Sequence, residues 1–190
     1  MAQYEFTTKG PKIIWLPFWL FISSRPRQLL KNFALFAALV FEGEFFNPSK
    51  LAAVVLGFLI FSMLTSAIYI INDLIDVEKD RAHPFKSKRP IAAGRVKPVV
   101  AFVAAVALLV LALFISSRLS AFFTFALSAY TVLQIAYSLF LRSVILLDVM
   151  AIATGFLLRV YAGAVLIDAH VTIWFILTVA SFILGFMVNP

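Results

Sequence analysis

The sequence contains no cysteine, two histidines and few charged residues. Of its 190 residues, 13% are Asp, Glu, Lys or Arg, whereas 63% are hydrophobic. The absence of cysteine excludes disulfides and thiolate metal sites, and His83 and His170 are too few and too far apart to form a zinc site. Any metal bound by this chain therefore needs oxygen ligands.

Long apolar runs dominate what remains. Each run has about 20 residues, the length that a helix needs to cross a bilayer. The mean hydropathy of the sequence is +1.03. We expect an all-α, polytopic transmembrane helix bundle. The predicted helices are residues 28–41, 51–72, 98–116, 119–141, 145–167 and 171–188.

The first residues differ from this helical domain, which we place at 28–190. Residues 1–27 are predicted to form a polar or interfacial segment, and their start shows no cleavage pattern of a removed signal peptide. The apolar stretch 13–22, with Trp15 and Trp19, is too short to span a membrane. It either lies in the membrane interface or opens the first helix.

The net charge of +7 comes from basic residues that gather in short segments beside apolar runs. No aromatic-interleaved basic surface is present, so nucleic-acid binding is a poor interpretation. Loop 73–97 is rich in Lys and Arg, whereas the turn at 41–50 holds Glu42, Glu44 and a single Lys50. Because basic loops stay on the cytoplasmic side, we expect a plasma-membrane protein with loop 73–97 and both termini in the cytoplasm.

Acidic residues follow the second apolar run in a helical spacing. If that helix continues, Asn72, Asp73, Asp76 and Asp80 fall within about one quadrant of its surface. Carboxylates at this spacing repel one another, so a stable arrangement calls for a cation, and hard oxygen ligands with room for water suit Mg²⁺.

A basic stretch at 81–90 comes directly after these acids. Acids that hold Mg²⁺ beside cations that hold phosphate oxygens are typical of a diphosphate site. The plainer interpretation is that the acids end a helix and the bases follow the positive-inside rule. Three aspartates at membrane depth favour function, because buried charge there is costly.

Two motifs resemble a known family. The spacing Asn72-Asp73-x-x-Asp76-x-x-x-Asp80 and the segment Arg89-Pro90-Ile91-Ala92-Ala93-Gly94 are similar to motifs of the UbiA-type intramembrane prenyltransferase superfamily. Segments 76–86 and 25–32 most resemble its decaprenyl-phosphate phosphoribosyltransferase branch, as do Tyr137-Ser138, Asp148 and the run 158–163. The superfamily has about nine helices and a second acidic motif after the sixth, which this chain does not reach. We therefore expect a fragment of a longer product or an inactive copy.

The resemblance implies a reaction and a set of site residues. The donor would be phosphoribosyl diphosphate, and the acceptor would be a polyprenyl phosphate. Asp73, Asp76 and Asp80 would be catalytic, with Mg²⁺ held by Asn72, Asp76 and Asp80 and the leaving diphosphate gripped by cations of the loop. The predicted substrate-binding residues are Arg27, Lys31, Asn72, Arg81, Lys86, Arg89, Tyr137 and Arg159.

Alternatives stay open at this point. The same acidic motif would serve an aromatic prenyltransferase that ionises a prenyl diphosphate. A non-enzymatic cation carrier or scaffold is a further alternative, although a carrier would place acids in the middle of several helices. Arg159 falls mid-helix, where a charge is either paired or lines a polar cavity, whereas Gly155 and Gly163 suit close helix packing.

Overall fold

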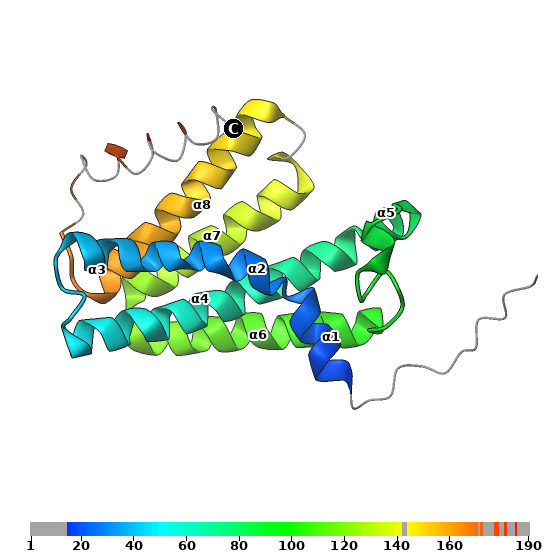
Figure 1. Cartoon of the computed structure of the whole chain (residues 1–190), viewed down its shortest axis with the longest axis horizontal. Coiled ribbons are helices and arrows are strands. Elements are labelled where there is room, and N and C mark those ends of the chain that lie inside the picture. Colours follow the sequence, from blue (N-terminus) through cyan, green and yellow to red (C-terminus); the bar gives the residue numbers. More distant parts are fainter. Residues whose placement is uncertain are drawn as a thin grey trace, which may run out of the picture.

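The structure, a computed structural model, describes residues 15–141 and 144–170, together with residues 172, 177, 178, 181 and 185. Within these residues the chain is helical and contains no strand. The predicted all-α bundle is therefore confirmed (Figure 1). The last predicted helix, at 171–188, lies mostly outside the described residues.

Four helices are long and apolar enough to cross a membrane. They are α4 (Pro48–Ile75), α6 (Pro98–Leu119), α7 (Ala121–Leu139) and α8 (Ile145–Leu166). Their bounds lie close to the predicted ranges, because Pro98 starts α6 and the Ser120 side chain caps α7 by accepting a hydrogen bond from the Phe123 amide. The chain thus has the architecture of a multi-pass membrane protein.

The first predicted helix, at 28–41, has a different form. It consists of α2 (Pro26–Leu29), a 3₁₀ segment η2 (Leu30–Phe36) and α3 (Ala37–Phe41). Segment η2 packs very closely on α8, where a Cβ added at Gly163 would lie 2.7 Å from the carbonyl carbon of Leu35. Tertiary contact rather than helix propensity therefore sets the backbone of this segment.

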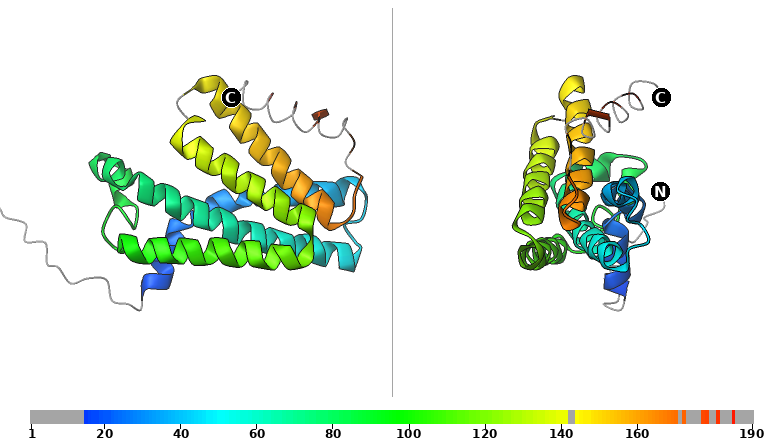
Figure 2. Two further views of the ribbon diagram at one scale, coloured as in Figure 1. Left: turned by 180° about the vertical axis from the view of Figure 1, so that it is seen from behind. Right: turned by 90° about the vertical axis from the view of Figure 1, so that its left-hand side faces the viewer.

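Helix α1 (Leu16–Ser23) is separate from this first span. Arg25, with a φ of +53°, lies in the left-handed region and breaks the path between α1 and α2. Helix α1 runs steeply across α4 and α6 (Figures 1 and 2). Its Trp15 and Phe21 are exposed, and the Arg95 guanidinium lies 4.3 Å from the ring centre of Trp19. For the described residues 15–22 this arrangement is compatible with a place in the membrane interface, which stays a prediction.

Helix α4 is the central element, in contact with α6, α7, α8 and η2. Large side chains such as Phe61, Leu64, Phe123 and Leu127 are fully buried between them. The end of α4, the start of α2, the end of α7 and the start of α8 lie toward the same end of the bundle (Figure 2). The polar residues of these elements meet at this end.

Candidate active site

The helical path is interrupted in the middle of the acidic motif. Helix α4 ends at Ile75, Asp76 has φ −92° and ψ 8°, and the short helix α5 (Val77–Ala82) follows. A basic loop with the 3₁₀ turn η3 (Lys86–Lys88) then folds back toward the start of α6. The helix is thus broken locally at Asp76, although the hydrogen bonds from the Asp76 amide to the Asn72 carbonyl and from the Asp80 amide to the Asp76 carbonyl continue across the break. The acidic residues divide into two sets by their contacts.

The first set is an ion-pair cluster of Asp73, Asp80, Arg25 and Arg89. The two carboxylates are buried, with 2% and 3% of their residue surface exposed. The Arg89 Nη1 atom lies 2.6 Å from Asp80 Oδ2 and 3.3 Å from Asp73 Oδ1, and Arg25 donates a further hydrogen bond to Asp73 Oδ1. Two guanidinium groups thus neutralise the carboxylates of Asp73 and Asp80, which contact these arginines and do not line the cavity of Asn72 and Asp76.

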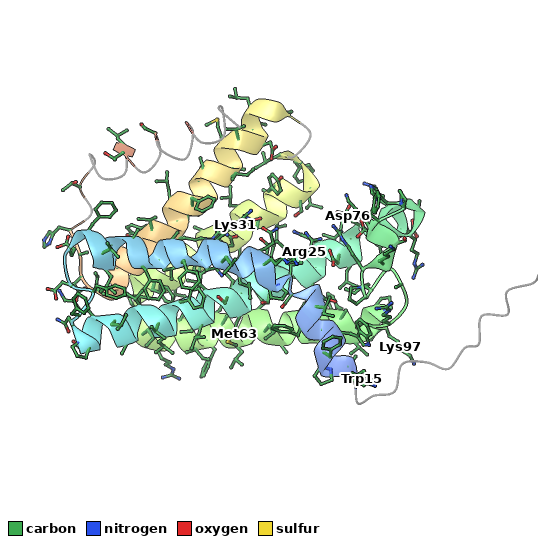
Figure 3. All side chains as sticks on the ribbon, in the orientation of Figure 1. Trp15, Arg25, Lys31, Met63, Asp76 and Lys97 are labelled. Atoms are coloured by element: carbon green, nitrogen blue, oxygen red, sulfur yellow. The ribbon has the colours of Figure 1, made fainter. Side chains whose placement is uncertain are left out.

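The second set, Asn72 and Asp76, lines a cavity of about 350 Å³ between the ends of α2, α4, α7 and α8. Lys31, Arg25 and Asp76 follow one another toward the α5 end of the bundle (Figure 3). The cavity brings together many residues that were predicted from sequence. These are Lys31, Asn72, Asp76, Lys86, Arg89, Tyr137 and Arg159.

Asn72 and Asp76 line the end of this cavity near the basic loop, here called the outer end, and their side-chain oxygens could bind a metal. The Asn72 side-chain oxygen accepts a hydrogen bond of 2.7 Å from the Ser138 hydroxyl, which links α4 to α7. Among the described residues no three His, Cys, Asp or Glu side chains are close enough to enclose a metal. This donor set fits Mg²⁺, which typically uses one or two carboxylates together with water and substrate phosphates.

The inner end of the cavity is built around Arg159, which is only 4% exposed. Its guanidinium donates hydrogen bonds to Asn32 Oδ1 at 3.0 Å, to the Gly155 carbonyl at 2.9 Å and to the Tyr130 hydroxyl at 2.6 Å. In the described part of the chain no carboxylate forms an ion pair with Arg159 or with Lys31. This end therefore carries the buried positive charge of Arg159 and the exposed charge of Lys31, and no carboxylate pairs with either among the described residues.

The two ends are well separated along α7. Ser138 contacts the outer end through Asn72, and Tyr130 contacts the inner end through Arg159. Eight residues of helix correspond to about 12 Å. The cavity thus presents side-chain oxygens and cations at one end, and at the other end it presents cations that form no ion pair with a described carboxylate.

Not every predicted residue reaches this cavity. Arg27 lines a second cavity of about 580 Å³, together with Lys88 and Phe85, on the other side of Arg25 and Arg89. The exposed Arg81 donates a long hydrogen bond of 3.4 Å to the Ala92 carbonyl. His83 Nδ1 accepts hydrogen bonds from loop amides, which agrees with a structural role in the loop.

Sequence reasoning missed several polar residues that line the cavity. The missed polar residues are Arg25, Gln28, Tyr69, Tyr130, Gln134 and Ser138. One signal was available for α7: Tyr130, Gln134 and Tyr137 are spaced four and three residues apart, so these large polar side chains lie on one face of a largely apolar helix. The other positions show no pattern of this kind.

Comparison with known proteins agrees with this fold. The sequence profile of the UbiA prenyltransferase family matches residues 32–189. The chain belongs to this family. Its similarity to a solved UbiA homolog from Archaeoglobus fulgidus, bound to DMAPP and Mg²⁺, has a TM-score of 0.75 at 24% identity and covers 88% of this chain and 60% of that one.

Curated UbiA-family relatives are closer in sequence. The chain is 41% identical over 160 residues to a decaprenyl-phosphate phosphoribosyltransferase of Mycolicibacterium smegmatis, which covers 82% of this chain and 50% of that protein. A protein of the same name from Corynebacterium glutamicum is 36% identical, with coverage of 82% and 48%. The chain thus spans about half the length of these relatives. The resemblance inferred from the two motifs is confirmed.

Proposed function

We propose that this UbiA-family chain carries the donor-binding half of a Mg²⁺-dependent transferase that moves a phosphoribosyl group from phosphoribosyl diphosphate to a polyprenyl phosphate. The observation that carries the proposal is the two-ended polarity of the cavity. A donor with a diphosphate on one side of the sugar and a phosphate on the other matches two charged ends that lie about 12 Å apart along α7. The names of the curated relatives support the same reaction.

At the outer end, cations would hold the leaving diphosphate. Lys86 and Arg89 line the cavity beside Asp76. Arg81 lies outside the cavity but belongs to the same basic segment and would add to the positive field. Neutralisation of the diphosphate favours departure as positive charge develops on the ribose ring. Asp73 would act indirectly, because it holds Arg25 and Arg89 in place.

Asn72 and Asp76 would hold the Mg²⁺ ion at this end. When bound, Mg²⁺ supplies charge neutralisation to the diphosphate oxygens. Asp80 is the third proposed ligand, although its carboxylate contacts Arg89 in this structure. Arg89 lines the cavity as well, so a turn of its guanidinium toward the diphosphate would release Asp80 for the metal.

At the inner end, Lys31 and Arg159 would bind the 5-phosphate. Two cations without carboxylate partners in the described residues give a dianionic phosphate charge-assisted hydrogen bonds. Tyr137, next to Ser138 on α7, lines the same cavity and would contact the donor near the sugar. The donor would thus be fixed at both phosphates, which orients the ribose for attack.

The acceptor needs a separate place for its phosphate. The second cavity offers Arg27 and Lys88 beside the exposed ring of Phe85. A lipid phosphate there would lie next to the donor cavity, because Arg25, Gln28 and Arg89 line both. We propose that loop 73–97 faces the cytoplasm of the plasma membrane, in agreement with its basic residues.

A second candidate is prenyl transfer to an aromatic acceptor. The solved homologs from Archaeoglobus fulgidus are described with DMAPP and Mg²⁺ and with GPP and Mg²⁺. A prenyl tail in this cavity, however, would meet Gln134, Lys31 and Arg159. Contact of hydrocarbon with buried charge is unfavourable, which weighs against this candidate.

Calorimetry distinguishes the two candidates. Phosphoribosyl diphosphate and farnesyl diphosphate would each be titrated into the purified chain in lipid nanodiscs, with and without Mg²⁺. We expect Mg²⁺-dependent binding of the sugar donor and weak binding of the prenyl donor. A preference for farnesyl diphosphate would support prenyl transfer, and binding of neither would refute a donor site in this chain.

A further inference from the structure

Asn32 is a fully buried side chain of η2 that connects three elements. Its exposed fraction is 0%, and its amide nitrogen donates hydrogen bonds of 3.1 Å to the hydroxyls of both Ser62 and Thr65 on α4. Its side-chain oxygen accepts the 3.0 Å bond from Arg159 Nε on α8. Because both amide protons point to α4, the oxygen faces the guanidinium.

The neutrality of this acceptor has an electrostatic consequence. Asn32 orients the Arg159 guanidinium as a carboxylate would, but it adds no negative charge. Among the described residues the guanidinium also faces the rings of Tyr130, Phe156 and Phe61, which stabilise a cation without neutralising it. The other partners of Arg159, the Tyr130 hydroxyl and the Gly155 carbonyl, are also neutral. At the ion-pair cluster, in contrast, Arg25 and Arg89 meet carboxylates.

We propose that Asn32 is a positioning residue that holds Arg159 in place and preserves its full charge for an anionic group of the substrate. The inference rests on the proposed function, because it assigns that group as the phosphate monoester at the far side of the donor sugar. Asn32 does not line the cavity, so it acts through Arg159 and not by contact with the substrate. A neutral amide at this position thus determines specificity for a donor with a second phosphate.

The substitution Asn32→Asp tests this role, because it changes charge with almost no change of shape. An aspartate here would pair with Arg159 and could accept hydrogen bonds from the Ser62 and Thr65 hydroxyls. We expect the thermal unfolding midpoint of the chain in nanodiscs to stay equal or rise. Affinity for phosphoribosyl diphosphate is expected to fall about tenfold or more, since a charge-assisted bond is lost.

Inorganic diphosphate provides the second ligand, because it requires only the outer end of the cavity. Its Mg²⁺-dependent affinity is expected to change less than about twofold in Asn32→Asp. Loss of both ligands together would overturn the proposal, since it would indicate a general structural role. Unchanged affinity for the sugar donor would overturn it as well.

Two further variants keep the test decisive. Asn47→Asp introduces the same charge at the N-cap of α4, where an aspartate also serves as a cap, and we expect no change in either affinity. Asn32→Ala removes the anchor without adding charge, and it should weaken sugar-donor binding less than Asn32→Asp does. If Asn32→Asp does not insert stably, an unaltered donor affinity of Asn32→Ala would contradict the proposal.

The proposed function and this inference fail in distinguishable ways. If the unmodified chain binds farnesyl diphosphate and not the sugar donor, the proposed function is refuted. If the unmodified chain binds the sugar donor and Asn32→Asp binds it equally well, only the role of Asn32 is refuted.

Discussion

The arginines near the loop, Arg25 and Arg89, differ from Arg159 in the groups that balance their charge. Arg25 and Arg89, near the loop, contact the buried carboxylates of Asp73 and Asp80. Arg159 is as deeply buried as those carboxylates, yet its hydrogen-bond partners are neutral. Carboxylates balance Arg25 and Arg89 without a ligand, and these pairs stabilise the fold, although Arg89 would turn to the diphosphate when the donor binds. Arg159 has no carboxylate partner among the described residues, so an anion would balance its charge.

The largest effect is expected at the outer end of the cavity. Asp76→Ala removes the carboxylate that lines the cavity beside Asn72. Mg²⁺-dependent donor binding should fall by at least about 100-fold, because loss of a group that only supports a metal ligand already costs about 10- to 100-fold. Glu78→Ala is the matched control, because Glu78 is an exposed acid on α5. Calorimetry of both variants gives the answer. Retained binding in Asp76→Ala would refute its role as a ligand.

Exchange of Arg89 and of Arg159 for glutamine tests directly whether the two arginines have different roles. Arg89→Gln leaves Asp73 and Asp80 with one cation fewer, and because 27% of the Arg89 side chain is exposed we expect a moderate destabilisation of about 1–3 kcal/mol. Arg159→Gln removes an uncompensated buried charge and should not lower the unfolding midpoint. It should instead lower affinity for phosphoribosyl diphosphate about tenfold.

Thermal unfolding and donor titration of the two variants form one experiment. The account requires stability loss in Arg89→Gln and selective loss of sugar-donor binding in Arg159→Gln. A large stability loss in Arg159→Gln would show instead that this arginine is a structural residue.

A change at Gly163 tests how the packing of η2 on α8 affects the inner end of the cavity. Gly163→Ala would place a methyl group against the backbone of Leu35 and push η2, which carries Lys31 and Asn32, away from α8. We expect a destabilisation of about 1–3 kcal/mol, the usual cost of overpacking, and weaker binding of the sugar donor than of inorganic diphosphate. Gly155→Ala is the control for packing, since its nearest neighbour would lie at an ordinary 3.5 Å.

The smallest effect concerns the loop. Lys86 lines the cavity, whereas Lys97, which precedes α6, does not. Lys86→Ala should therefore weaken donor binding about three- to tenfold, the range of one exposed charge-assisted contact, and Lys97→Ala should leave it unchanged. Equal losses, measured by calorimetry at one ionic strength, would indicate a diffuse positive field.

The spans were predictable because lipid sets the length of an apolar run and because Pro98 and Ser120 mark helix starts. The form of η2 was not predictable, since it depends on the approach of Gly163 from α8. The division of the acids was missed for a similar reason. Arg89 lies nine residues beyond Asp80, and only the folded loop brings its guanidinium to both Asp73 and Asp80.

The inner end shows the limit of local patterns most clearly. Arg159 was predicted as a substrate-binding residue because a charge in mid-helix is costly. Its partner Asn32 is 127 residues away in sequence, and Tyr130 is 29 residues away. No spacing rule connects three helices in this way, although the stripe of Tyr130, Gln134 and Tyr137 identifies the face of α7 that is involved.

Phosphorus NMR of the bound donor tests the central claim most directly. Phosphoribosyl diphosphate with Mg²⁺ would be added to the chain in nanodiscs and to its Arg159→Gln variant. The account predicts that the diphosphate and the 5-phosphate resonances both shift with the unmodified chain, and that the 5-phosphate resonance alone returns toward its free position with the variant. A 5-phosphate resonance that keeps its free position with the unmodified chain would contradict the account.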